Sequence, residues 1–561
     1  MTEPFLTVCR RARPFAGQVG AFLAWTVLFA LSTTQAPPYY SNQNQYLLHG
    51  LAAVGDGNLG DDWLANTLSP TPVFDALVTV TARHLGERLF PVYYALLQGA
   101  YFVSLLGIAT HVAGDRLTPR TRCLVAALLF LAHAAVLRWA SFQVFGWDYP
   151  CYAQGWLAAQ YVLGPVFQPS AFGVFLVVAL HQFLRGRPVV AVTCAALAVT
   201  LHPTYALSAG LIVLGILATL RGEGRTRRAV ICGALFAVLV LPTVVYVGST
   251  FRSTNPEMAQ AVQSLLVNVR IPHHAIPAVW FDGVTAVQLV AIVVGVALTR
   301  GTRLFPVVRI LAVGSLLLTL VQLGSGSDTL ALMFPWRSSV ILIPVATAVI
   351  LTRLVTLAGR RLDGRATVAV STAIIAACTV LGAGLMLTRQ GYAARPNEAG
   401  LLDFVRTHKQ PGDVYLLPVE VPKPPQRWSG SLSSDFKPAA APRLVGRVIP
   451  ADLQRFRLVT RAAIFVDFKA IPYKDVEVLE WHRRLLWTQS VYESRDWDRA
   501  GTLREAIAEG VTHVVTTADR DVSSAGLALE FADDAFKLYR VRRGLPEDRG
   551  PDGPAGGTIG P

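Results

Sequence analysis

Apolar stretches of roughly 17–25 residues, the length that crosses the hydrocarbon core of a bilayer, recur along the first 390 residues of this chain. We place about eleven of them, near residues 15–33, 92–113, 121–138, 170–184, 188–202, 204–220, 229–247, 284–299, 304–323, 336–352 and 367–387. Charged residues make up only 15% of the 561 residues, whereas a soluble domain carries roughly 25%. The sequence therefore predicts a multi-pass α-helical membrane protein.

Arginines concentrate in every second connection between these spans. They lie near residues 10–13, 116–122, 185–187, 221–228, 300–303 and 353–365. Positive residues stay on the cytosolic side, so the pattern predicts a cytosolic N-terminus and, with an odd number of spans, an extracytoplasmic C-terminal part. By our boundaries these segments carry about +14, which equals the formal net charge of the whole chain. The basic character therefore reflects orientation and gives no evidence for a nucleic-acid partner.

Four connections on the opposite side are long enough to form a site: residues 34–91, 141–170, 249–283 and 324–337. The first contains a run that predicts a surface helix over residues 72–85. Residues 1–390, with these loops, form the predicted membrane domain. Every lysine lies after residue 400, in a part with a different composition.

Short apolar runs alternate with helical patterns after residue 390, which is typical of an α/β domain. We expect helices over 398–407, 475–488 and 496–508 and strands over 413–417, 456–460, 463–467, 512–517 and 536–540. The predicted extracytoplasmic domain is residues 391–545. The tail, 546–561, is rich in Gly and Pro and is expected to be disordered.

Two adjacent carboxylates, Asp61 and Asp62, lie in the first long loop. Neighbouring acids repel each other, so one holds its proton longer unless a cation lies between them. Such a pair can supply a general base, or oxygen ligands for a divalent metal such as Mg²⁺ or Mn²⁺. The alternative is that one of them caps the short helix that begins at Trp63. His49 lies upstream in the same loop and is a further candidate for substrate binding.

Cationic and polar side chains on the other outer loops are candidates for binding a phosphate. Arg270, His273 and His274 lie together in the sequence RIPHH and can donate hydrogen bonds to an anion; the alternative is a proline-stiffened loop with surface histidines. Arg337 begins a span from the outer side, where an arginine can also extend toward lipid headgroups. Asp148 and His202 add polar groups on this side, each of which could instead be a turn or interfacial residue.

The predicted spans contain no Asp or Glu. Proton- or ion-coupled transporters generally need an ionisable group near the middle of the membrane. Its absence weakens the transporter hypothesis and favours an enzyme that works at the outer interface.

Several motifs resemble a known family. The many spans, the acid pair in a long first loop, the outer Arg and His residues and the C-terminal α/β domain resemble the GT-C superfamily of integral-membrane glycosyltransferases. More narrowly, "NQYLLHGLA", "DDWLANTLSPTPVFDAL", "FQPSAFGVFL", "HPTY" and "RIPHH" look like a bacterial multi-pass group of unassigned function. The resemblance covers about residues 15–545. The chain lacks the WWD motif of oligosaccharyltransferases, which leaves the acceptor open.

This resemblance implies a GT-C-type enzyme of the bacterial plasma membrane that moves a sugar from a polyprenyl-phosphate donor to a glycan, lipid or protein acceptor of the cell envelope. Asp62 or Asp61 would be the catalytic carboxylate, with or without a metal. The departing lipid phosphate is an anion, and Arg270, His273, His274 and Arg337 would stabilise it. Two alternatives stay open, since resemblance of fold does not fix function: a transporter or flippase for a lipid-linked glycan, and a non-catalytic assembly protein.

Overall fold

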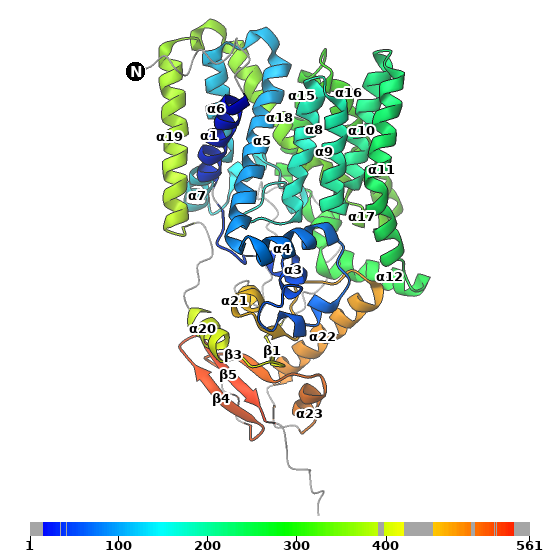
Figure 1. Cartoon of the computed structure of the whole chain (residues 1–561), viewed down its shortest axis with the longest axis vertical. Helices are drawn as coiled ribbons and strands as arrows, with labels where there is room; N and C mark the ends of the chain where they lie inside the picture. Colours follow the sequence, from blue (N-terminus) through cyan, green and yellow to red (C-terminus); the bar gives the residue numbers. More distant parts are fainter. Residues whose placement is uncertain are drawn as a thin grey trace, which may run out of the picture.

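The computed structural model describes residues 15–33, 35–40, 42–390, 398–419, 453–494, 497, 500–520, 522 and 524–542. An upright bundle of helices forms one end of the molecule, and a small sheet with its own helices forms the other (Figure 1). The bundle contains α1 (Phe15–Thr33), α5 (Phe90–Ala113), α6 (Pro119–His133), α7 (Ala135–Phe145), α8 (Val174–Leu184), α9 (Pro188–Leu201), α10 (Ala206–Gly222), α11 (Thr226–Thr250), α15 (Gly283–Leu298), α16 (Leu304–Ser325), α18 (Ser339–Ala358) and α19 (Arg365–Leu387).

Each of the eleven predicted spans is helical in the structure. Among the described residues, seven helices are long and apolar enough to cross a membrane, or up to eight if the bent pair α6 and α7 counts as one span. Three further apolar helical segments, which correspond to α8 with the turn before it, α9 and α15, are shorter than 18 residues. The predicted class, a multi-pass helical membrane protein with a C-terminal domain that contains a sheet, is confirmed.

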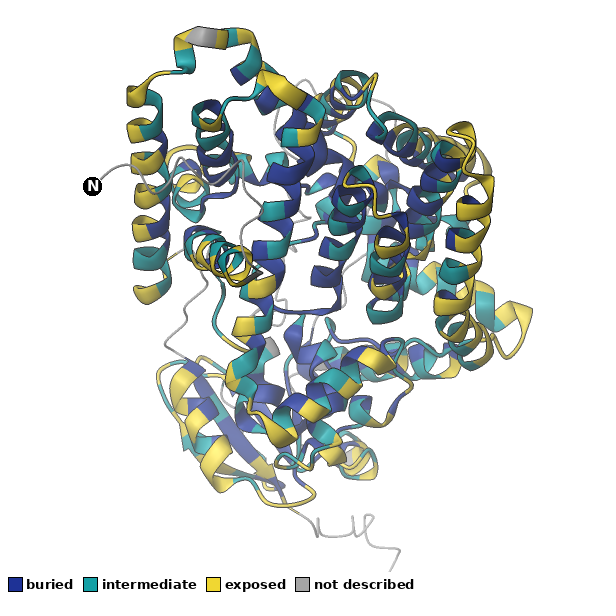
Figure 2. Ribbon diagram, turned by 45° about the horizontal axis from the view of Figure 1, so that its top comes forward, coloured by how far each residue is buried: buried dark blue, intermediate teal, exposed yellow. Residues whose placement is uncertain are grey.

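Apolar side chains cover the outside of the bundle. Figure 2 shows exposed residues along the outward faces of the outer helices, and on α11 these include Val230, Val238 and Leu241, each more than half exposed. An apolar surface of this extent is unfavourable in water and suits contact with lipid. Inside the bundle, Phe29 stacks on Phe102 at 4.9 Å in a dense aromatic core.

Small residues allow helices of the bundle to pack closely. A Cβ at Gly382 on α19 would collide with the carbonyl oxygen of Leu31 on α1, so only glycine permits this approach. Close contact between small residues is the usual way in which membrane helices associate.

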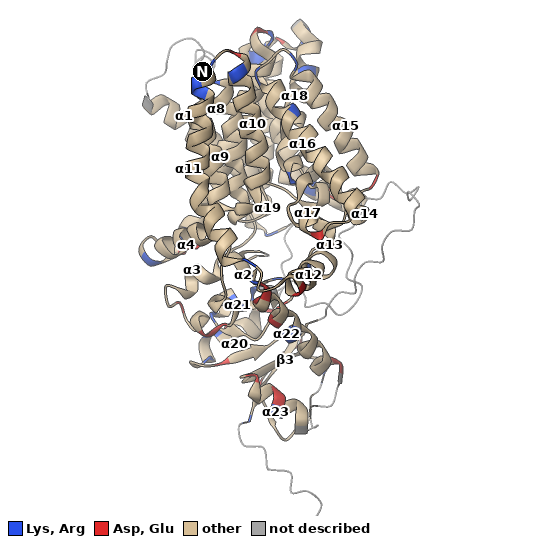
Figure 3. Ribbon diagram, turned by 90° about the vertical axis from the view of Figure 1, so that its right-hand side faces the viewer, with Lys and Arg blue, Asp and Glu red and all other residues tan. Residues whose placement is uncertain are grey.

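The basic connections gather at the end of the bundle that lies away from the sheet (Figure 3). Arg303 pairs with Glu223 at 2.5 Å, and the Thr118 hydroxyl donates to Asp363 at 2.7 Å, so neighbouring connections at this end are tied together. The separation agrees with the charge pattern on which the predicted orientation is based. The cytosolic N-terminus itself stays a prediction.

The long connections on the side of the C-terminal domain contain α2 (Gln43–Tyr46), α3 (Leu48–Ala52), α4 (Pro72–His84), α12 (Pro256–Leu265), α13 (Pro272–Ala275), α14 (Pro277–Trp280) and α17 (Asp328–Leu332). Two of these connections, residues 34–91 and 249–283, contact that domain. The surface helix expected over residues 72–85 is therefore confirmed as α4. A proline occupies the first turn of this helix, where the backbone N–H has no acceptor within the helix, so that its absence does not destabilise the helix.

The described part of the C-terminal domain contains a five-stranded mixed sheet in the order β2-β1-β3-β5-β4. Its elements are α20 (Ala399–His408), β1 (Val414–Leu416), α21 (Phe456–Thr460), β2 (Ala463–Ile464), α22 (Asp475–Ser494), α23 (Ala500–Ala508), β3 (His513–Thr517), β4 (Leu527–Ala532) and β5 (Phe536–Val541). Strand β1 runs parallel to β2 and β3, and β5 is antiparallel to both β3 and β4. The predicted boundaries of this domain and the predicted disordered tail, 546–561, lie outside the described residues.

One predicted strand is wrong. Residues 456–460, which mix apolar and polar side chains, form helix α21, in which Arg457 is buried together with Phe456 and Leu458 and is held by ion pairs. Arg461 has a positive φ of 57° and ends this helix. Strand β4, which no pattern in the sequence predicted, completes the sheet.

Candidate functional site

Asp62 is fully buried where the first outer loop meets the C-terminal domain. Its Oδ2 accepts from Nε of Arg457 at 2.7 Å and from the amide of Ile464 at 3.0 Å. Its Oδ1 accepts from the amide of Leu64 at 2.9 Å and so caps the short turn that follows. Arg457 also pairs with Asp467 at 3.0 Å. Both carboxylate oxygens of Asp62 are engaged by these partners, so its contacts favour a structural role, and the catalytic role stays an untested prediction.

Asp61 points elsewhere. It is exposed, and its Oδ2 accepts from the amide of Gly412 at 3.3 Å. The described residues contain no group of three or more His, Cys, Asp and Glu side chains that could hold a metal. Because Arg457 occupies the Asp62 carboxylate, the predicted metal site at Asp61 and Asp62 does not fit this geometry, and we derive no step through a metal.

Five of the predicted phosphate-binding residues come from elements that meet at the outer end of the bundle. Arg270 ends the π-helical turn η10 (Leu266–Arg270), and Arg337 lies in the 3₁₀ turn η11 (Pro335–Ser338). His273 and His274 lie on α13, and His202 lies between α9 and α10. We call these five residues together with Lys469 of the C-terminal domain the basic cluster.

Hydrogen bonds and ring contacts hold the arginines of the basic cluster. The guanidinium of Arg270 donates to the carbonyl oxygen of Lys469 and lies over the ring of Phe468 at 5.4 Å. Nη2 of Arg337 lies 3.2 Å from Nε2 of His202, and its guanidinium lies 4.9 Å from the ring centre of Tyr205. Aromatic faces attract cations that have lost part of their water.

The histidines of α13 are placed by backbone contacts. Nδ1 of His274 lies 2.7 Å from the carbonyl oxygen of Ala158, and the indole of Trp336 donates to the carbonyl oxygen of His274 at 2.8 Å. The rings of His273 and His274 are 4.1 Å apart. Helix α13 is thereby fixed between the second and fourth outer loops.

The pKa values of the basic cluster are lowered first by burial and then by neighbouring positive charge. Burial, and then the neighbouring cations, lower the pKa of His273 to about 2 and that of His274 to about 4, so both rings are neutral at pH 7. Burial and the charge of Arg270 lower the pKa of Lys469 to about 8, against an opposing effect of Asp467. Three cations, Arg270, Arg337 and Lys469, therefore lie within electrostatic reach of His274.

Donor atoms of this cluster are left without partners. Nε of Arg270 and Nε of Arg337 are buried and have no hydrogen-bond partner among the described residues, and the same holds for Nδ1 of His202. Buried donors of this kind are expensive unless something accepts from them. An anion with several oxygens, such as a phosphate, would satisfy them.

A half-buried carboxylate, Asp75 of α4, lies in the first loop close to Tyr46. It lines a pocket of about 10 Å³ together with His49, Tyr46 and Tyr473, which has room for roughly one water. Tyr46 also lies 6.2 Å from His202, ring to ring. Oδ1 of Asp75 is buried without a partner among the described residues, and burial raises its pKa to about 7.

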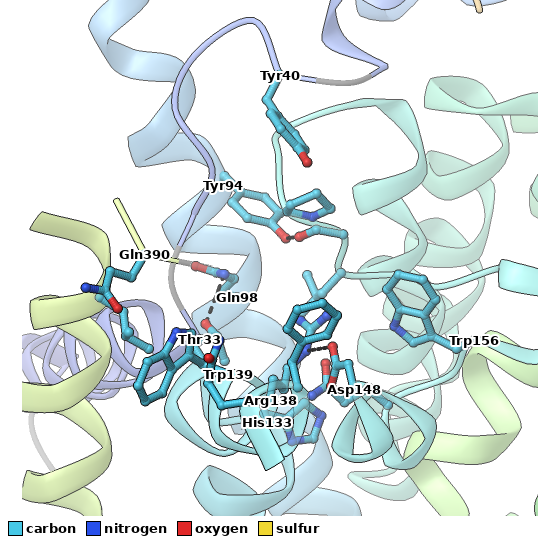
Figure 4. Close-up of a pocket in the computed structure, with 18 residues that line it drawn as sticks. Thr33, Tyr40, Tyr94, Gln98, His133, Arg138, Trp139, Asp148, Trp156 and Gln390 are labelled. Carbon is cyan, nitrogen blue, oxygen red and sulfur yellow. Dashed lines mark hydrogen bonds and ion pairs between the residues drawn. The ribbon is translucent and has the colours of Figure 1, made fainter. Parts of the chain in front are cut away.

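Asp148 lies apart from the basic cluster. It forms an ion pair with Arg138 at 2.7 Å and lines a cavity of about 580 Å³ inside the bundle. Figure 4 shows this pair among the side chains of Trp139, Trp156 and Gln98.

The sequence thus indicated most of the basic cluster, but three residues of the region were missed. Lys469, Asp75 and Arg457 had no signal of their own, because each is an ordinary charge in a helix or strand pattern. They are recognised as part of this region only by their proximity to Arg270 or Asp62, and this proximity exists only in the folded chain.

Comparisons with known proteins found one short family match and a distant structural likeness. Residues 447–488 match a domain of unknown function (DUF6798), a segment that includes Arg457, Asp467 and Lys469. No curated protein matches. The chain is similar to the crystal structure of ArnT from Cupriavidus metallidurans bound to undecaprenyl phosphate, at 14% identity and a TM-score of 0.42, over 94% of this chain and 98% of that one. A likeness of this size carries no argument about chemistry.

Proposed function

We propose that this protein is a membrane glycosyltransferase that takes a sugar from a polyprenyl-phosphate donor and transfers it on the side of the bundle where the C-terminal domain lies. The observation that carries the proposal is the basic cluster, in which Arg270, Arg337 and Lys469 are held together and two guanidinium Nε atoms have no partner among the described residues. A phosphate at the interface of a membrane bundle is the ligand that these donors fit.

The cations of the cluster would act on the leaving group. When the bond between the sugar and the phosphate oxygen breaks, negative charge grows on the phosphate, and positive groups that are already in place stabilise it without reorganisation. The neutral rings of His273 and His274 would donate hydrogen bonds. Partial exclusion of water strengthens each of these interactions.

A transfer to a hydroxyl also needs a proton acceptor. We propose Asp75 for this role in place of Asp62, because one carboxylate oxygen of Asp75 has no partner in the described part of the chain and the residue borders the cluster through Tyr46. Its pKa of about 7 suits a general base at neutral pH. In this assignment Asp62 and Arg457 hold the first loop and the C-terminal domain together around the site.

A binding and turnover experiment tests the proposal. The full chain in lipid nanodiscs would be titrated with polyprenyl phosphate, and transfer would be followed with radiolabelled polyprenyl-phosphate sugars and membrane acceptors. Arg270→Gln and Lys469→Gln should each weaken polyprenyl phosphate binding by about 10- to 100-fold, the value of a charge-assisted hydrogen bond. Arg227→Gln, at an exposed position on α11 at the opposite end, is the matched control. Equal binding by all three variants would refute the phosphate site.

A transporter for a lipid-linked glycan is the second candidate. The observation in its favour is the 47° bend between α6 and α7, since broken membrane helices form substrate sites in transporters. Movement of a labelled lipid-linked glycan across proteoliposomes without any transfer product would support this second function.

A further inference from the structure

A cavity of about 580 Å³ lies in the bundle between α1, α5, the α6–α7 break, the loop after α7 and the end of α19 (Figure 4). This volume falls within the usual range for small-molecule sites. The polar and aromatic side chains that line it include Tyr94, Gln98, Arg138, Trp139, Asp148 and Trp156.

The cavity forms where a membrane helix is interrupted. Ala134 has an extended backbone, with ψ of 126°, and separates α6 from α7 at a bend of 47°. Irregular backbone at membrane depth is tolerated where it is buried in protein or lines a polar cavity. The break places Arg138 and Trp139, on the first turns of α7, at the cavity wall.

The charges in this cavity cancel, in contrast to the basic cluster. Nε of Arg138 and Oδ2 of Asp148 are 2.7 Å apart, so the pair offers polar atoms without net charge. Both ring nitrogens of His133 already have hydrogen-bond partners. Nε2 lies 3.1 Å from the hydroxyl of Tyr101, and Nδ1 lies 2.8 Å from the carbonyl oxygen of Leu129. An anionic or cationic ligand would therefore find no excess charge of the opposite sign among the described residues of the wall.

A buried amide in the cavity wall, that of Gln98, has an acceptor without a partner among the described residues. Gln98 on α5 is 1% exposed, and its Nε2 donates to the hydroxyl of Thr33 at 3.0 Å. Its Oε1 has no partner in the described part of the chain. Because buried acceptors in folded proteins are nearly always hydrogen-bonded, we expect a donor to bind to this oxygen. A hydroxyl group is a donor of this kind and can also accept from neighbouring groups.

We infer that this cavity binds a neutral, hydroxyl-rich ring, such as an uncharged sugar, with Gln98 and the Arg138–Asp148 pair on its hydroxyls and Trp139 and Trp156 against its faces. The inference rests on the proposed glycosyl transfer and names the substrate class: a neutral glycosyl unit, from either the donor lipid or the acceptor. Flat aromatic walls with a few fixed polar groups are typical of sites for small ligands.

One loop joins this cavity to the basic cluster. Trp156 lines the cavity, while two residues later the carbonyl oxygen of Ala158 contacts His274 of the cluster. Trp156, Ala158 and Ala159 have positive φ values of 72°, 53° and 53°. Non-glycine residues in this region are strained and are found at functional sites. The loop thus holds a ring-binding wall and a phosphate-binding residue in fixed relation.

Binding of sugars to the full chain in nanodiscs tests the inference. Saturation-transfer NMR and calorimetry would use a panel of neutral methyl glycosides, a methyl uronoside as the charged comparison, and a polyprenyl-phosphate sugar. We expect a neutral glycoside to bind, and Gln98→Leu to weaken that binding roughly three- to tenfold, the value of one hydrogen bond. Gln322→Leu is the matched control, because Gln322 is likewise a buried glutamine of a membrane helix with an unpartnered Oε1 among the described residues but does not line this cavity.

The outcomes separate this inference from the proposed function. If no neutral glycoside binds, or if Gln98→Leu and Gln322→Leu have the same effect, the cavity inference is overturned, even when polyprenyl phosphate still binds to the basic cluster. Preference for the methyl uronoside would also overturn it. Competition between a free glycoside and the polyprenyl-phosphate sugar would assign the cavity to the donor's sugar, and simultaneous binding would assign it to the acceptor.

Discussion

Replacing Asp62 by asparagine distinguishes a structural carboxylate from a catalytic one. The side chains of Asp62 and Arg457 are 0% and 2% exposed, so the substitution leaves a buried guanidinium with Asp467 as its remaining carboxylate. Removing one partner of a buried ion pair costs about 3–5 kcal/mol. Because Asp467 keeps part of the compensation, we expect the lower end, ~3 kcal/mol.

Thermal unfolding of the full chain in detergent, followed by tryptophan fluorescence, measures this loss. Trp481 and Trp497 are buried in the core of the C-terminal domain and report its unfolding. A loss of ~3 kcal/mol corresponds to a melting temperature lower by roughly 6–12 °C for a domain of 150–250 residues.

Asp61→Asn is the matched control, since the carboxylate of Asp61 is exposed. Its unfolding free energy should change by no more than about 0.5 kcal/mol. The structural reasoning is refuted if Asp62→Asn unfolds at the wild-type temperature. If transfer is also lost in that stable variant, Asp62 is the catalytic carboxylate that the sequence suggested.

Three further outcomes are expected. Because burial raises the pKa of Asp75 to about 7, and the base is the deprotonated form, transfer should rise about tenfold per pH unit below pH 7 and level off above it; an Asp75→Asn variant with an unchanged pH profile would contradict the assignment. Gly50→Ala should destabilise the first loop by about 1–3 kcal/mol, measured by thermal unfolding, because the new Cβ would lie 2.6 Å from Cβ of Val78. Arg461→Met should make the first loop more sensitive to protease, since it removes the 2.7 Å ion pair with Glu87; an unchanged digestion rate would show that this pair does not fasten the loop.

The sequence indicated the loop of the basic cluster better than it indicated the acids. Arg270, His273 and His274 lie within five residues of one another, so their common location follows from the chain itself. The adjacency of Asp61 and Asp62 was misleading, because one is exposed and the other is buried in an ion pair with a residue 395 positions away. Pattern alone cannot distinguish these two environments.

The sequence by itself determined the membrane class, the succession of apolar helices and the separation of basic from non-basic connections. The physical reason is that the length, hydropathy and charge of each segment decide locally whether it inserts into a bilayer and on which side its ends remain. The tertiary structure alone decided that Arg457 holds Asp62, that Lys469 contacts Arg270, and that a break between two helices forms part of the wall of a cavity in which Arg138 pairs with Asp148. These features depend on contacts between distant segments, whose energies exist only after the chain has folded.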